Sequence, residues 1–430
     1  MIAFGFYLLL IVSYFLHLTA RVTWLGAIRF DLVLMGLVLV ASFMEPKQEG
    51  DRRDHSTKFL WMIIGFIVLS LPFVMWPGSV LRAGMLNYLK VVVFYFFTVS
   101  IINNERRLKI FTFVFLACAI FRFIEPAYLH ATTGYWGSSA FSTFEGSLLK
   151  LKRLSGAPSD VINPNQLAWV VVSTVPFLYY LGWQGKSHFK ILSAAVASVG
   201  IYVLMLTGSR SGLLSLIITI IAILFYGEKK FKRAAIGLMI LVPVAFFVAG
   251  KLSPDLSTRY MSTFEGGLPG SDTASGRIRG IERGISTLGA RILIGHGLGT
   301  SSETNANLSS GGAQKSHNLY LETVQELGLI GLFLFLLYVR GMYRNLCDAK
   351  SILKDTSHEN HWLTALAKAV HVWIIMDIFY SIACFGLNSW EWYFFGGVSV
   401  AVLRVARKNE KLNAAMEIPR QNQVLIPATP

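Results

Sequence analysis

The chain has 430 residues, of which 54% are hydrophobic and only 15% charged. Soluble domains are about 45–50% apolar and about a quarter charged, so this composition argues against a soluble globular protein. The net charge of +15 would suggest nucleic acid in a soluble protein. In a membrane protein it indicates basic cytoplasmic loops instead, and we expect membrane lipids and no nucleic acid as partners.

Apolar runs of about 16–22 residues recur between short charged loops. This pattern predicts an all-α polytopic membrane protein, because a membrane barrel would show alternating segments of about ten residues. The sequence predicts about twelve transmembrane helices, at approximately 2–18, 28–44, 58–76, 84–102, 109–124, 164–182, 190–207, 211–226, 234–250, 318–339, 362–384 and 389–405.

The two ends of the chain allow further expectations. The first apolar run lacks a preceding basic region, so residues 2–18 are interpreted as a retained helix, with cleavage after Leu18-Thr19-Ala20 as the alternative. Residues 1–410 are expected to form one transmembrane domain. Residues 411–430 contain prolines and show no clear periodicity, which favours a disordered cytoplasmic tail.

Basic residues predict the orientation in the membrane. With twelve spans, more than half of the 39 Lys and Arg residues fall in loops and a tail on one side, which is then the cytoplasm. Both termini lie on that side. Two long loops, 125–163 and 251–317, and the tight turn 207–212 face outward, together with their arginines and histidines.

The outward loop 251–317 contains an apolar periodicity typical of a helix lying on the membrane surface. Its apolar positions, three and four residues apart, are Ile278, Ile281, Ile285, Leu288 and Ile292. Ser275 is the expected cap of this helix. Its cationic residues are Arg277, Arg279, Arg283 and Arg291. They either pair with lipid phosphates or bind an anionic, phosphate-bearing substrate, for which guanidinium groups are suited.

Further candidates lie where loops meet apolar spans. His317 precedes a span and could accept a proton from a hydroxyl, or merely cap the helix; His296 is a rival base. Arg210 is either functional or a membrane anchor. Within the span, Glu322 could orient His317, while Glu326 is more deeply placed. The three cysteines lie in separate segments, and no residue spacing indicates a metal or cofactor site.

Five short motifs together resemble the superfamily of O-antigen ligases and O-antigen polymerases, which are polytopic bacterial glycosyltransferases. They occur in the expected order within residues 163–331. The motifs are NPNQLA from Asn163, GSRSG from Gly208, SGR from Ser275, IGHGLG from Ile294, and HNLYL from His317 followed by ELGLIG from Glu326.

This resemblance implies a GT-C-like fold in the bacterial inner membrane and a periplasmic active site. The donor would be a glycan on undecaprenyl diphosphate, transferred to a hydroxyl without metal or cofactor and with inversion. Arg210 and Arg277 would hold the diphosphate, and His317 would activate the acceptor. The remaining candidates for substrate binding are Arg279, Arg283, Arg291 and Glu322. Arg279 could replace Arg277 as the phosphate ligand.

Three functions remain open. The first is an O-antigen ligase with lipid A–core as acceptor, favoured by the chain length and the single large loop between spans nine and ten. The second is an O-antigen or exopolysaccharide repeat-unit polymerase with the same donor. The third is a transporter of lipid-linked sugars, which would predict structural repeats and charges near the bilayer midplane. No repeat is visible, and the arginines lie at the outer edge.

Overall fold

The computed structural model describes most of the chain as helices, with the gaps stated here. The described residues are 2–45, 54–137, 141–144, 147–160, 162–182, 187–226, 237, 256, 260, 271–309, 312–313, 315, 317–355, 361–383 and 386–424. The span expected at 234–250 lies outside this part, apart from residue 237.

Most helices fall where hydropathy predicted spans. The main ones are α1 (Ile2–Phe15), α4 (Phe30–Phe43), α5 (Thr57–Ser70), α7 (Met85–Ile101), α8 (Glu105–Thr133), α9 (Pro164–Phe177), α10 (Ser187–Thr207), α11 (Arg210–Tyr226), α16 (Leu319–Asp355), α17 (His361–Tyr380) and α18 (Trp390–Val424). Short helical segments connect them: α2 (Leu18–Arg21), α3 (Thr23–Ala27), η1 (Leu71–Phe73), α6 (Pro77–Ser79), η2 (Val80–Gly84), η3 (Leu178–Gly182) and η6 (Ser381–Ala383).

Length and composition make this a multi-pass membrane protein. Within the described ranges, five helices are long and apolar enough to cross a membrane, and four shorter apolar helices accompany them. Large apolar side chains such as Phe43, Leu69 and Phe225 are more than 70% exposed, as expected of a surface that faces lipid. The total of twelve spans stays a prediction.

The centre of the bundle is a packed aromatic core. Helix α18 packs against α7 and α16, and α17 packs against α11. Trp373 stacks on Phe395 with ring centroids 3.8 Å apart, and Phe111 stacks on Phe394 at 5.2 Å. Such ring pairs add about 0.5–1.5 kcal/mol each beyond the burial of their area. This packed core fixes the positions of the helix ends that carry the polar residues.

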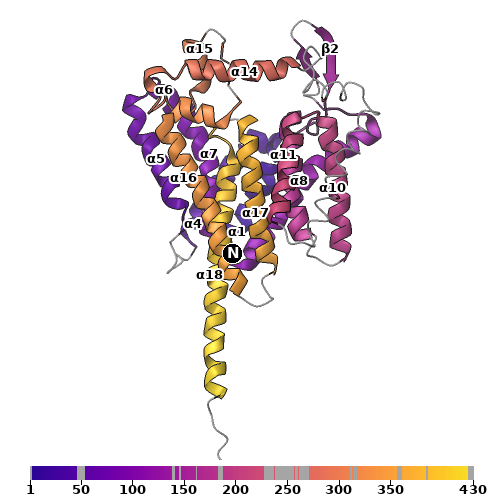
Figure 1. The fold of residues 1–430 in the computed structure, drawn as a ribbon, viewed down its shortest axis with the longest axis vertical. Coiled ribbons are helices and arrows are strands. Elements are labelled where there is room, and N and C mark those ends of the chain that lie inside the picture. The colour runs from indigo at the N-terminus through magenta and orange to yellow at the C-terminus, as the bar shows by residue number, and fades with distance from the viewer. Residues whose placement is uncertain are drawn as a thin grey trace, which may run out of the picture.

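One end of the bundle carries the described parts of the two long loops. Figure 1 shows α14 (Ser271–Ser286) and α15 (Ser301–Leu308) lying across this end, with strand β2 (Ser147–Lys152) at the same end. Strand β2 pairs antiparallel with β1 (Phe141–Phe144). The prediction of an all-α fold therefore needs one correction, a two-stranded hairpin in the loop 125–163. In β2, the run Leu149-Lys150-Leu151-Lys152 alternates apolar with polar residues, as a strand with one apolar face does.

The opposite end is dominated by α18, whose C-terminal half projects beyond the other helices (Figure 1). The helix continues to Val424, whereas the sequence predicted a disordered tail from residue 411. Lys411, Leu412, Ala414 and Ala415 are strong helix formers, and adding residues to an existing helix avoids the cost of nucleation. The sequence did not predict this extension because the residues after 411 show no amphipathic period. A helix that packs against no other element needs no apolar face.

The helix predicted within the loop 251–317 is present, but its bounds differ from those expected. Helix α14 begins at Ser271, so Ser275 lies inside it rather than at its cap. It ends at Ser286, and a tighter turn, η4 (Gly289–Arg291), follows where Gly289 has a φ of 42°. Ile278 and Ile285 are each more than half exposed, in keeping with a face that lies in the membrane interface. Gly284 packs closely on Leu321 of α16.

The outer loop is anchored on a break in α16. Gly328 has a φ of 67° and a ψ of −172°, which interrupts the helix. Backbone bonds from a neighbouring segment replace the lost helical bonds: Gly297 N donates to Glu326 O at 2.9 Å, and Leu329 N donates to Ile292 O at 2.8 Å. A Cβ on Gly328 would overlap the Leu293 carbonyl, so this position requires glycine.

Candidate active site

A cavity of about 510 Å³ lies between α14 and the helices beneath it. Residues from distant parts of the chain line it. They are Tyr14, Phe15, His17, Arg122, Ile162, Asn163, Asn165, Gln166, Trp169, Val170, Gly276, Arg277, Arg283, Lys315, His317, Tyr380, Ala383, Ser389, Trp390 and Glu391. Two groups of these residues, with different chemistry, define the cavity.

The first group, called here the cationic wall, consists of Arg277, Arg283, Lys315 and His317. The two arginines lie on α14, and Lys315 and His317 lie in the segment before α16. Arg277 and Lys315 are close enough to His317 to act on its charge. Three fixed positive groups beside one imidazole suit an anionic ligand next to a proton acceptor.

His317 is held at the start of α16 by its neighbours. It adopts a left-handed backbone with a φ of 55°. The following Asn318 caps the helix, since its Oδ1 accepts from the backbone N–H of Leu321 at 3.0 Å. Partial burial, and then the positive charges of Arg277 and Lys315, lower the pKa of His317 below its usual value. The imidazole is therefore neutral at pH 7 and can accept a proton.

Arg210 begins α11 within the Gly-Ser-Arg-Ser-Gly turn. Gly208 has a φ of 57°, and Ser209 caps the helix, because its Oγ accepts from the N–H of Gly212 at 3.2 Å. Arg210 is not among the lining residues, but its charge lies close enough to Arg277 for the two to repel each other. The structure thus places Arg210 beside the cationic wall rather than in it.

The other residues predicted from the sequence lie apart from the cavity lining. Arg279 is exposed, whereas Arg283 reaches the cavity from the same helix. Arg291 donates to the Phe73 carbonyl. The Glu322 carboxylate accepts from the backbone N–H of Gly386 at 3.3 Å and interacts with the backbone N–H of His317. Glu322 therefore supports the backbone at His317, and no bond from it to the imidazole is recorded among the described residues.

Two further residues near the cavity, His296 and Glu326, are bonded to backbone groups. The His296 side chain is buried, and its Nε2 lies 2.9 Å from the Thr287 carbonyl. Burial lowers the pKa of His296, and it is not among the lining residues. Glu326 Oε2 accepts from the N–H of Gly299 at 2.8 Å, so this acid stabilises the glycine-rich turn. These contacts favour His317 over His296 as the base.

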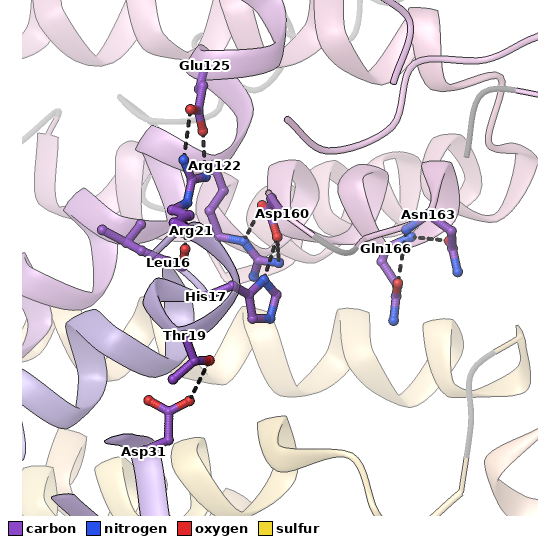
Figure 2. A network of polar contacts seen from close by, with 10 residues as sticks. All are labelled: Leu16, His17, Thr19, Arg21, Asp31, Arg122, Glu125, Asp160, Asn163 and Gln166. Carbon is purple, nitrogen blue, oxygen red and sulfur yellow. Dashed lines mark hydrogen bonds and ion pairs between the residues drawn. The ribbon is translucent and has the colours of Figure 1, made fainter. Parts of the chain in front are cut away.

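Figure 2 shows a network that the sequence did not reveal, around Asp160. Arg122 donates to the two Asp160 oxygens, both at 2.9 Å, and His17 Nδ1 lies 2.6 Å from Asp160 Oδ1. Beside it, Arg21 donates to Glu125 at 2.8 Å. The Asp160 side chain is fully buried, while that of His17 is 34% exposed.

The charge on Asp160 decides how His17 is held. Burial alone would raise the pKa of Asp160, but the hydrogen bonds and charges of His17 and Arg122 outweigh it and keep that pKa below its usual value. Asp160 is therefore ionised at neutral pH, and an ionised carboxylate can only accept hydrogen bonds. His17 Nδ1 must then carry the proton, which leaves Nε2 as the other ring position.

The second group, called here the aromatic wall, consists of His17, Asn165, Trp169, Trp390 and Glu391. Trp390 links it together, with ring centroids 5.8 Å from Trp169 and 4.4 Å from Phe15. Asn163 caps α9, and Gln166 reaches back to the Asn163 N–H at 3.1 Å. This capping box explains the NPNQ motif in structural terms and places Asn165 and Gln166 at the cavity.

One missed lining residue, Arg122, could have been found from the sequence. It lies inside an apolar span, where a charge is costly and marks a site or a buried partner. His17 and Lys315 gave no such signal, because a histidine at the end of a span and a lysine in a loop are both common. Asp160 needed the fold, since its partners come from α8 and from the junction of α1 and α2. Across the residues the structure describes, no cluster of three or more His, Cys, Asp or Glu side chains is placed to hold a metal ion.

Bundle and cavity together define a multi-pass membrane protein with a cationic site at one end. Residues 194–336, about a third of the chain, match the model of the family described as O-antigen ligase. This match includes Arg210, Arg277 and His317, and it supports the resemblance to the superfamily of O-antigen ligases and polymerases that the sequence motifs indicated. Members of this family are glycosyltransferase-like enzymes. No curated protein matches the chain.

Proposed function

We propose that the protein is an O-antigen ligase, which transfers a glycan from undecaprenyl diphosphate to the lipid A–core of lipopolysaccharide. The observation that carries this proposal is that one cavity contains both His317 and the cationic residues Arg277, Arg283 and Lys315. The family match to O-antigen ligases supports it. The site would lie on the periplasmic side of the bacterial inner membrane, with both chain ends in the cytoplasm and residues 1–410 as one transmembrane domain.

The proposed reaction is a single displacement. His317 takes the proton from an acceptor hydroxyl, and the hydroxyl oxygen bonds to the anomeric carbon of the donor sugar. The bond between that carbon and the diphosphate oxygen breaks, and undecaprenyl diphosphate leaves with the bonding electrons. Attack opposite the leaving group inverts the anomeric configuration, and no metal or cofactor takes part.

The arginines would act where charge develops. Negative charge increases on the diphosphate as the sugar–oxygen bond breaks, so fixed cations stabilise the transition state more than the bound donor. Arg277, Arg283 and Lys315 line the cavity, while Arg210 lies beside Arg277. Arg210 and Arg277 are proposed to hold the diphosphate, and Arg283 to assist. Glu322 is proposed to position His317 through the backbone.

The second candidate is a repeat-unit polymerase, which uses the same donor and the same cavity with another lipid-linked glycan as acceptor. The family match is compatible with both. A transporter of lipid-linked sugars is the rival from another class. Purified protein with a lipid-linked donor and an acceptor distinguishes it, because only a transferase forms product in detergent.

Complementation tests the proposal directly. Wild type should restore the lipopolysaccharide ladder of a ligase-deficient strain, while His317→Ala, Arg210→Ala and Arg277→Ala should fail at equal membrane levels. His188→Ala, an exposed histidine on α10, is the matched control and should behave as wild type. If wild type extends glycans only in a polymerase-deficient strain, the polymerase is the correct function. Active variants would mean that the site lies elsewhere.

A further inference from the structure

The cavity has a second wall that the proposed reaction does not yet use. If the cationic wall holds the donor diphosphate, the sugar bonded to that diphosphate must lie in the same cavity. Besides His17, the ionisable groups at the aromatic wall are Glu391 and, beside it, Arg122, which is paired with Asp160. It therefore offers no uncompensated positive charge to a phosphate, and its chemistry suits a neutral, polar ligand.

His17 is the most firmly fixed polar group of this wall. Its left-handed backbone, with a φ of 50°, is shared among the described non-glycine residues only by Arg29 and His317. Such strained positions concentrate at functional sites. Asp160 binds Nδ1, and Arg122 holds Asp160 through two oxygens. Nδ1 is thereby held at Asp160, and a neutral ring with its proton on Nδ1 accepts a hydrogen bond from a hydroxyl at Nε2.

The surrounding residues have the other features of a sugar site. The Trp169 and Trp390 rings are nearly perpendicular, at 87°, and both line the cavity. Aromatic rings offer large apolar faces to the C–H groups of a sugar. Glu391 Oε2 is buried and has no hydrogen-bond partner among the described residues. A buried polar oxygen without a partner is costly, and a ligand hydroxyl would satisfy it.

We propose that the aromatic wall is a sugar subsite. His17 Nε2 accepts a hydrogen bond from a hydroxyl of the sugar that the diphosphate carries, Trp169 and Trp390 contact the ring, and Glu391 accepts from a second hydroxyl. Asp160 and Arg122 act as positioning residues that fix the His17 tautomer. This inference rests on the proposed donor class, and it assigns sugar binding to the aromatic wall and diphosphate binding to the cationic wall.

The test uses a substitution that spares the buried network. In His17→Asn, the amide nitrogen can donate to Asp160 as Nδ1 does, and asparagine tolerates the left-handed backbone. The outer part of the ring, including Nε2, is lost. Binding to the full chain in detergent is measured for undecaprenyl diphosphate alone and for undecaprenyl diphosphate carrying one N-acetylhexosamine. His188→Asn on the exposed face of α10 is the control.

We expect His17→Asn to weaken binding of the sugar-bearing lipid about tenfold, the size of one lost hydrogen bond with its partner left unpaired. Binding of the bare lipid should stay within about twofold, whereas Arg277→Ala should weaken both. Equal effects of His17→Asn on the two lipids, or none, would overturn the proposal.

A second binding measurement tests whether the subsite holds the donor sugar or the acceptor sugar. If His17→Asn weakens binding of deacylated lipid A–core oligosaccharide and leaves the sugar-bearing lipid unchanged, the assignment to the donor sugar is wrong. The transfer reaction, measured in the same micelles, tests the proposed function separately. Absence of transfer by wild type would refute the ligase, while the difference between the two lipids would still decide whether the subsite exists.

Discussion

The two histidines of the cavity, His17 and His317, lie far apart in the sequence and are held in different ways. Both adopt a left-handed backbone, His17 immediately before α2 and His317 two residues before α16. His17 is bonded to a buried carboxylate, which is itself neutralised by Arg122. His317 lies among positive charges that lower its pKa. The first arrangement suits the sugar recognition proposed for His17, and the second suits the proton transfer proposed for His317.

The largest expected effect is a loss of stability when Asp160, the partner of His17, is replaced. Asp160→Asn leaves the Arg122 charge without its partner at a buried site. Breaking one partner of a buried ion pair costs about 3–5 kcal/mol. Thermal or denaturant unfolding in detergent measures this loss. The control is Glu125→Gln, which breaks the more exposed ion pair between Arg21 and Glu125; Glu125 lies on α8, as Arg122 does. It should cost less stability. Equal losses for the two variants would contradict a buried ion pair at Asp160.

The next largest effect is a loss of catalytic rate when His317 is replaced, with little change in stability. His317→Ala removes the proposed base, and general base catalysis contributes about 100- to 10,000-fold. We expect kcat to fall within that range while donor binding and unfolding change little. Single-turnover transfer with purified enzyme measures it. A loss that appears in donor binding instead would make His317 a binding residue.

Arg277→Ala should lower the rate about 100-fold, by analogy with other preorganised groups that stabilise charge. It should also change the pH profile. The pKa of His317 is held down partly by the Arg277 charge, so removing that charge raises the pKa of His317. The acid limb of kcat/KM, where the base becomes protonated as pH falls, should then move to higher pH. An unshifted limb would show that another group titrates.

The smallest effect compares two arginines on one helix. Arg283 lines the cavity, while Arg279 is exposed and does not. Arg283→Ala should raise the KM for the lipid-linked donor about tenfold, about the value of one charge-assisted hydrogen bond. Arg279→Ala removes the same charge from the same helix and should change the KM less than about twofold. The reverse order would make Arg279 the phosphate ligand.

Local signals identified the cationic wall except Lys315, but of the aromatic wall they marked only Asn165, which lies in the NPNQLA motif. Arg277 and His317 lie within short motifs, and the helix period around Ile278 and Ile285 indicated a surface helix. The hydropathy also located most of the described spans. Asp160 and His17 meet only because α1, α8 and the segment before α9 pack together, and no sequence period encodes such a contact. The helical tail of α18 was missed because it has no apolar face to detect.

The break at Gly328 also has a mechanical consequence. Residues 319–327 form a short first segment of α16, with His317 two residues before it and the Gly328 break at its far end. The backbone bonds of Ile292 and Gly297 tie that break to the loop that follows α14. A tilt of α14 would therefore displace the short segment as a lever and move His317 relative to the arginines. The break at Gly328 would thus couple the position of α14 to the geometry of the proposed active site.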